Sequence, residues 1–192
     1  MVKLVLASTS RYRRDLLARL QIPFSVADPG VAEQARPGED PQDMSRRLAE
    51  DKARAVGMRE PDAVVIGCDQ VAVADGTIVG KPGNRDNAIR QLLALSGRDV
   101  LFHTALCVHN AASDRTTTRV VTTRVTFRTL DLAAIERYLD REQPYDCAGS
   151  AKSEGLGIAL VGSMACEDPN ALIGLPLIAL VDLLAEHGMR IP

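Results

Sequence analysis

The start of the chain constrains the fold most, because a strand, a short polar loop and a helix follow one another within 20 residues. Lys3–Leu6 predicts a strand, residues 8–10 read Ser-Thr-Ser, and Arg11–Leu20 predicts a helix. The first helical turn carries Arg11, Arg13 and Arg14, although a helix N-terminus favours acidic groups. Backbone N–H groups, hydroxyls and guanidinium groups gathered there form a phosphate site. A solvated basic helix start, capped by Ser8 or Ser10, is an equally good interpretation.

Strands and helices alternate along the rest of the sequence, which favours an α/β fold. Further strands are predicted at Phe24–Val26, Ala63–Gly67, Val71–Val73, Thr77–Val79, Val100–Val108 and Thr116–Phe127. Further helices are predicted at Pro41–Val56, from Arg85 to Leu95, from Asp131 to about Asp140, and at Pro176–Glu186. We expect a mixed twisted sheet flanked by helices, with two lobes around a central cleft in a single domain over residues 1–192. No flexible linker or repeat is apparent.

The composition disfavours nucleic-acid-binding and membrane-spanning proteins. With 46% hydrophobic and 25% charged residues and a net charge of −2, the chain is typical of a soluble protein with no bulk attraction for nucleic acid. Aromatic residues make up 3%, which disfavours a stacking platform for single-stranded nucleic acid. The apolar runs are too short or too interrupted to span a membrane, and no signal peptide precedes the first strand. The four separated cysteines predict free thiols in the cytoplasm.

Several charged residues could bind or transform a ligand. Asp69 follows the predicted strand Ala63–Gly67 after one residue, where α/β folds place ligands, and could hold a divalent metal or accept a proton from water. Lys81 lies in the rigid turn Gly80-Lys-Pro-Gly83, which taken singly is usually only a turn. Lys52 lies at the edge of a helical apolar stripe, where lysines more often extend to solvent. Glu33 could join Asp69 at a metal, although a loop glutamate is usually only solvated.

The segment 143–157 reads Gln-Pro-Tyr-Asp-Cys-Ala-Gly-Ser-Ala-Lys-Ser-Glu-Gly-Leu-Gly and predicts a long polar loop. Its length without regular structure mildly favours a functional role over an irregular connection. Gln143 and Glu154 could hydrogen-bond the edge of a base, and Lys152 could meet a phosphate. Spacings typical of zinc sites or of a serine nucleophile are absent from the sequence.

Over essentially its full length the sequence resembles the Maf (septum-formation-inhibitor) family of nucleotide pyrophosphatases. The strings that carry the resemblance are Leu6-Ala-Ser-Thr-Ser10 with Arg13, Lys52-Ala53, Asp69-Gln70, Gly80-Lys-Pro82, Leu95-Ser-Gly97, and Asn170 with Gly174-Leu-Pro176. Residues 12–14, 69–73, 143–150 and 152–157 resemble the branch that acts on 7-methyl-GTP. The sister branch, which hydrolyses dTTP and UTP, usually has Arg, Thr and Gln where this chain has Tyr12, Gln70 and Glu154. The chain departs from the pattern at Ala32, where Asp is usual.

The resemblance implies a Maf/Ham1-like fold and a nucleoside triphosphate pyrophosphatase that converts 7-methyl-GTP to 7-methyl-GMP and diphosphate. It further implies a Mg²⁺ or Mn²⁺ cofactor on Asp69 and Glu33, and a homodimer in the cytoplasm. The implied catalytic residues are Asp69, Lys52, Lys81 and Arg13. The implied substrate-binding and specificity residues are Ser8, Ser10, Tyr12, Gln70, Gln143, Lys152 and Glu154. Two alternatives stay open: another triphosphate substrate (dTTP, UTP or an inosine-type nucleotide), and a nucleotide-sensing regulator of cell division without turnover.

Overall fold

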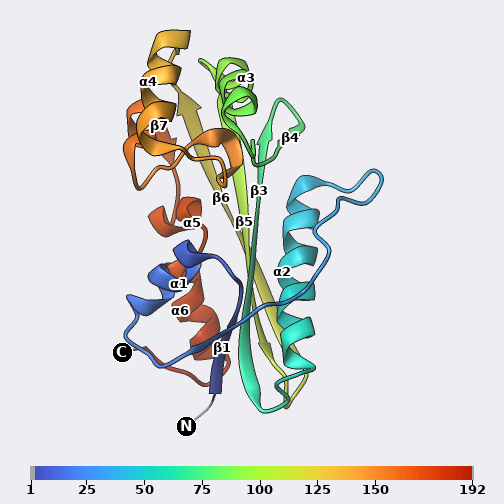
Figure 1. Cartoon of the computed structure of the whole chain (residues 1–192). Coiled ribbons are helices and arrows are strands. Elements are labelled where there is room, and N and C mark those ends of the chain that lie inside the picture. Colours follow the sequence, from blue (N-terminus) through green and yellow to red (C-terminus); the bar gives the residue numbers. More distant parts are fainter. Residues whose placement is uncertain (1–2, 192) are drawn as a thin grey trace. The chain divides into compact units, whose positions relative to one another are not determined.

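The computed structural model describes residues 3–191, in which strands and helices alternate (Figure 1). The strands are β1 (Lys3–Ala7), β2 (Ser25–Ala27), β3 (Ala63–Ala74), β4 (Thr77–Val79), β5 (Asp99–Asn110), β6 (Arg115–Phe127) and β7 (Val161–Ala165). The α-helices are α1 (Arg11–Ala18), α2 (Pro41–Gly57), α3 (Arg85–Leu95), α4 (Leu132–Glu142), α5 (Pro169–Ile173) and α6 (Leu177–Glu186). Two short 3-10 helices are η1 (Ala148–Ser150) and η2 (Leu156–Leu160).

The strands form one seven-stranded mixed sheet in the order β2-β1-β3-β5-β6-β7, with β4 paired to β3. β1 runs parallel to β2 and β3, whereas β4 is antiparallel to β3 and β7 is antiparallel to β6. The predicted mixed sheet flanked by helices is therefore confirmed. The predicted cleft and the single domain over residues 1–192 stay predictions.

The described chain divides into two compact units. Unit 1 comprises the residues up to Gln70, residues 103–121 and the residues from Asp168 onward. Unit 2 comprises residues 71–102 and 122–167. β3, β5 and β6 each contribute residues to both units.

In unit 1, helices cover both faces of the sheet, α1 and α6 on one face and α2 on the other (Figure 1). Alternating side chains of β1 account for this arrangement, since successive strand residues point to opposite faces. Leu4 and Leu6 join the core beneath α1 and α6, whereas Val5 and Ala7 join the core beneath α2. Because both faces are covered, β1 is apolar throughout its buried residues.

α2 approaches β3 very closely at Gly67. A Cβ atom at Gly67 would lie 2.1 Å from the backbone carbonyl oxygen of Ala49 and 2.9 Å from the Cβ of Ala53. Only glycine permits this approach. It brings the middle of α2, which carries Lys52, against the part of β3 that carries Asp69.

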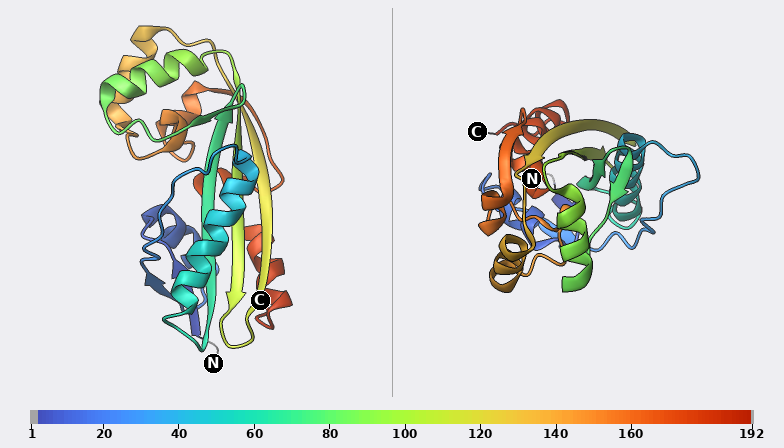
Figure 2. Two further views of the ribbon diagram at one scale, coloured as in Figure 1. Left: turned by 90° about the vertical axis from the view of Figure 1, so that its right-hand side faces the viewer. Right: turned by 90° about the horizontal axis from the view of Figure 1, so that it is seen from above.

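In unit 2, α3 and α4 lie side by side, as both views of Figure 2 show. Each helix begins at a side-chain cap: Asn84 accepts from the backbone N–H of Asn87, and Asp131 accepts from that of Ala134. The predicted Asp75-Gly76 hairpin joins β3 to β4, with both turn residues at positive φ.

The structure differs from the predictions at β3 and in the last third of the chain. The predicted strands Ala63–Gly67 and Val71–Val73 form one continuous strand, β3, because no glycine, proline or turn signal follows Gly67 before residue 75. Asp69 therefore lies within a strand rather than at its exit. Strand β7 and helix α5 were not predicted, and the segment 143–157 contains η1 and the start of η2.

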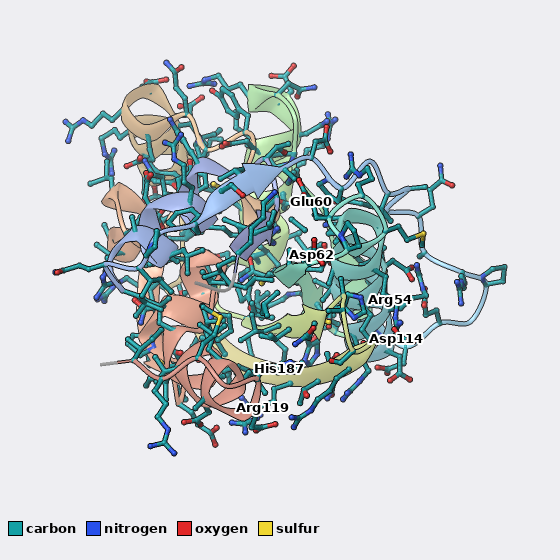
Figure 3. All side chains as sticks on the ribbon, turned by 90° about the horizontal axis from the view of Figure 1, so that it is seen from below. Arg54, Glu60, Asp62, Asp114, Arg119 and His187 are labelled. Atoms are coloured by element: carbon teal, nitrogen blue, oxygen red, sulfur yellow. The ribbon has the colours of Figure 1, made fainter. Side chains whose placement is uncertain are left out.

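Ion pairs join two helices of unit 1, α2 and α6, to the β5–β6 hairpin. Arg54 of α2 lies 3.0 Å from Asp114 in the hairpin turn, and the two side chains are neighbours in Figure 3. Arg119 of β6 binds Asp182 and Glu186 of α6 at 2.9 and 2.7 Å. Among the described helices, none combines the length and apolar character needed to cross a membrane.

Candidate active site

Asp69 lies just beyond the point where β1 stops pairing with β3. The last parallel pair is Ala7 with Gly67, so the neighbouring strand ends two residues before Asp69. The carboxylate is thus near the carboxyl end of β1 although β3 itself continues. The strand end at which an α/β fold places a ligand is therefore that of β1 and not that of β3.

Lys52 joins two carboxylates, and we call Glu33, Lys52 and Asp69 the Asp69 cluster. The Nζ atom of Lys52 lies 2.6 Å from Oδ1 of Asp69 and 2.5 Å from Oε1 of Glu33. The side chains of Lys52 and Asp69 are 5% and 9% exposed, whereas that of Glu33 is 56% exposed. Lys52 is therefore a buried, charge-paired lysine rather than one that extends to solvent.

Burial raises the pKa of Asp69 above the usual value of an aspartate. The charges of Lys52 and Arg13 act in the opposite direction, and the negative charge of Glu33 adds to the rise. The group is a carboxylate whose proton affinity depends on nearby cations. Such a group suits proton transfer or binding of a cation.

Arg13 is held close to this cluster by α5. Its Nε atom donates to the carbonyl oxygen of Gly174 at 3.0 Å, and the thiol of Cys68 donates to the same oxygen at 3.0 Å. Burial raises the pKa of Cys68, so the thiol stays protonated and acts as a donor. The close contact of Arg13 and Cys68 with Gly174 ties α1, β3 and α5 together within unit 1.

The Ser-Thr-Ser loop is organised by its own hydroxyl groups. Ser10 is the N-cap of α1, and its side chain accepts from the backbone N–H of Arg13 at 3.4 Å. Ser8 is buried, and its hydroxyl accepts from the backbone N–H of Ser10 at 3.1 Å. Tyr12 lies beneath the Arg11 guanidinium, whose central carbon is 4.8 Å from the ring centre.

Gln70 is bound to the protein interior through its amide nitrogen. Nε2 donates to the hydroxyl of Thr104 at 2.9 Å and to the carbonyl oxygens of Ala171 and Leu172 at 3.0 and 3.1 Å. These contacts join β3, β5 and α5. The nitrogen of Gln70 thus has three protein acceptors.

In unit 2, the predicted residues lie on loops. Lys81 is exposed in the turn after β4, and Gln143 is an exposed residue in left-handed conformation that ends α4. Lys152 binds the carboxylate of Glu142 at 2.7 Å, and Glu154 is exposed.

Helix α5 was not predicted from the sequence, although it and its C-cap residue Gly174 bind Arg13 and Gln70. A signal was present, since Asp168-Pro169 is the same N-cap and first-turn proline pair that predicted α2 at Asp40-Pro41. The ion pair of Glu142 with Lys152 was also missed. An ordinary helix-end glutamate carries no signal for a contact with a loop ten residues later.

Oxygen atoms of Asp69 and Glu33 are the metal ligands that the cluster offers. Within residues 3–191, there is no group of three or more His, Cys, Asp and Glu side chains that could hold a metal ion. Mg²⁺ commonly binds one or two carboxylates together with substrate phosphates, and in this structure the Nζ atom of Lys52 lies against both carboxylates of the cluster.

The chain belongs to the Maf family, since the family described as Maf-like protein matches residues 3–187. A 7-methyl-GTP pyrophosphatase of Methylobacillus flagellatus is 56% identical over 191 residues, which covers 100% of both chains. A protein of the same name from Nitrosospira multiformis is 56% identical, covering 98% of this chain and 96% of the relative. The Vibrio vulnificus protein of that name is 52% identical, covering 98% and 97%.

Proposed function

We propose that the chain is a nucleoside triphosphate pyrophosphatase that hydrolyses 7-methyl-GTP to 7-methyl-GMP and diphosphate. The observation that carries the proposal is 51–56% identity, along nearly the whole chain, with relatives named 7-methyl-GTP pyrophosphatase. In the reaction, water attacks the α-phosphorus, the bond from this phosphorus to the α–β bridging oxygen breaks, and diphosphate leaves.

The Asp69 cluster supports this chemistry. Asp69 orients or deprotonates the attacking water, or shares the metal. The charge of Lys52 opposes the effect of burial on the pKa of Asp69, and the 2.6 Å contact fixes the carboxylate, so it does not have to reorganise during the reaction. Arg13 and Lys81 supply positive charge to the phosphate chain, where negative charge develops.

Asp69 and Glu33 would hold the divalent cation, Mg²⁺ or Mn²⁺. When bound, this cation neutralises charge on the triphosphate and on the leaving diphosphate.

Base recognition is assigned to Glu154 and Gln143, which both belong to the segment 143–157, and to Tyr12, which would stack on the ring. A carboxylate only accepts hydrogen bonds, so it suits the amino and ring N–H edge of guanine and rejects pyrimidine carbonyls. Ser8 and Ser10 present the loop before α1 to a phosphate. Gln70 contributes to specificity by holding α5, since its amide nitrogen already has three protein acceptors.

The resemblance to the Maf family extends the proposal to a homodimer in the cytoplasm, with residues 1–192 as one functional domain. Nucleic-acid polymers and membranes are not proposed as partners. Size-exclusion chromatography with light scattering tests the dimer.

A panel of purified nucleotides tests the activity. Diphosphate release should be most efficient, as kcat/KM, for 7-methyl-GTP, and Glu154→Gln should reduce the preference over dTTP and UTP. Glu136→Gln on α4 is a matched control for the loss of one glutamate charge. A wild-type preference for dTTP, UTP or inosine triphosphate would contradict the substrate assignment, and absence of turnover with all of them would favour a nucleotide-sensing regulator.

A further inference from the structure

Glu142, the last residue of α4, holds both sides of the loop that carries Glu154. Its Oε1 atom lies 2.7 Å from Nζ of Lys152, and its Oε2 atom accepts from the backbone N–H of Leu156 at 2.7 Å. Lys152 and Leu156 are the residues two before and two after Glu154. One carboxylate therefore bridges the two ends of a five-residue segment with Glu154 at its centre.

The backbone of this segment is shaped to approach the carboxylate. A Cβ atom at Gly155 would lie 2.6 Å from Oε2 of Glu142, and one at Gly157 would lie 2.5 Å from the backbone nitrogen of Lys152. The segment is further closed by the bond from the Gly155 N–H to the Lys152 carbonyl oxygen at 3.0 Å. Glycine is therefore present at positions 155 and 157, where a side chain would collide with Glu142 or with the backbone of Lys152.

The ion pair of Glu142 with Lys152 is partly shielded from water. The side chains of Lys152 and Glu142 are 24% and 14% exposed. The hydrogen bond from Lys152, then that from Leu156, lowers the pKa of Glu142, so it stays charged at neutral pH. A second contact rests on the same helix: the hydroxyl of Tyr138 accepts from the backbone N–H of Lys152 at 3.2 Å.

We infer that Glu142 is a positioning residue for substrate specificity, which acts by fixing the 152–156 loop so that Glu154 is presented in one orientation. Lys152 then serves chiefly as the partner of Glu142 rather than as a phosphate ligand. This inference rests on the proposed function, in which Glu154 reads the base. A loop that is ordered only part of the time binds its ligand with an affinity reduced by that fraction.

Glu142→Gln tests the inference, with Asp140→Asn as the matched control. Asp140 is on the same helix and forms an ion pair of 2.9 Å with Arg85 of α3, not with the loop. Glu142→Gln should lower the ratio of kcat/KM for 7-methyl-GTP to that for UTP by about tenfold or more, as expected for loss of a charge-assisted contact. Asp140→Asn should leave the ratio unchanged.

Lys152 provides the conservative comparison. Lys152→Met should lower the same ratio, whereas Lys152→Arg, which keeps the charge, should retain most of it. Amide hydrogen exchange of residues 152–156 should accelerate in Glu142→Gln and Lys152→Met but not in Asp140→Asn.

The outcomes separate this inference from the proposed function. If wild type prefers 7-methyl-GTP and Glu142→Gln keeps both the ratio and the amide protection, the inference is wrong. An equal loss of kcat/KM for all nucleotides would also overturn it, because that result indicates general disruption. If wild type does not hydrolyse 7-methyl-GTP, the proposed function fails, and the exchange measurement still decides whether Glu142 orders the loop.

Discussion

Replacing Lys52 by Met should leave Asp69 as an uncompensated buried carboxylate. In the native protein the two charged atoms are 2.6 Å apart, and their side chains are 5% and 9% exposed. Removing one partner of such a pair costs about 3–5 kcal/mol. Lys52 also forms an ion pair with Glu33. Loss of this pair adds little to the free-energy cost, because the glutamate side chain is 56% exposed.

The loss of folding stability in Lys52→Met should depend on pH. Without Lys52, the pKa of Asp69 in the folded protein rises further above its unfolded value, since burial already raises it and the largest opposing charge is gone. The folded state then binds more protons than the unfolded state, so stability falls as pH rises from the unfolded towards the folded pKa. The slope is at most about 1.4 kcal/mol per pH unit, and the penalty should be small near pH 4.

Urea unfolding of wild type, Lys52→Met and Lys52→Met/Asp69→Asn at several pH values between 4 and 8 measures this effect. The double variant carries no buried carboxylate at position 69, so it should recover stability and lose the added pH dependence. The reasoning is refuted if Lys52→Met is as stable as wild type throughout, or if the double variant is no more stable than Lys52→Met at pH 8.

Four further results are expected. Gly67→Ala should destabilise the protein severely, because the added Cβ would lie 2.1 Å from a backbone oxygen. Gly80→Ala should have a much smaller effect in thermal unfolding, because a Cβ there would have no atom within 4 Å. The acid limb of the kcat/KM–pH profile should lie above the usual aspartate range, because burial raises the pKa of Asp69, and an ordinary acid limb would contradict this. EDTA should abolish diphosphate release and Mg²⁺ or Mn²⁺ should restore it; full activity after exhaustive chelation would exclude the cation. Arg13→Ala and Lys81→Ala should each lower kcat/KM by about 10²–10³-fold, and unchanged values would remove both from the phosphate site.

Local sequence signals predicted most of the elements. Asp40-Pro41 fixed the start of α2, since the Asp40 side chain accepts from the backbone N–H groups of Gln42 and Asp43. Asp75-Gly76 likewise predicted the turn between β3 and β4, because the sharp turn needs residues that tolerate positive φ. Signals of this kind act within a few residues, so they can be recognised without the rest of the chain.

The candidate site depended on contacts that are distant in sequence. Asp69 was singled out for its place after an apolar run, but the run continues as β3, and the strand that ends there is β1. The family resemblance implies a role for Lys52, but its position in the helix alone favours a lysine that extends to solvent, because the sequence does not show that Gly67 lets α2 approach β3. The three acceptors of Gln70 could not be predicted, since they come from β5 and from a helix that the sequence reasoning missed.

The most direct test of the central claim is product analysis of 7-methyl-GTP hydrolysis by wild type and Asp69→Asn, using phosphorus NMR. The account predicts 7-methyl-GMP and diphosphate from wild type and a rate lower by roughly 10²–10⁴-fold in Asp69→Asn, with its fold retained. Formation of 7-methyl-GDP and phosphate, or an Asp69→Asn variant as active as wild type, would contradict it.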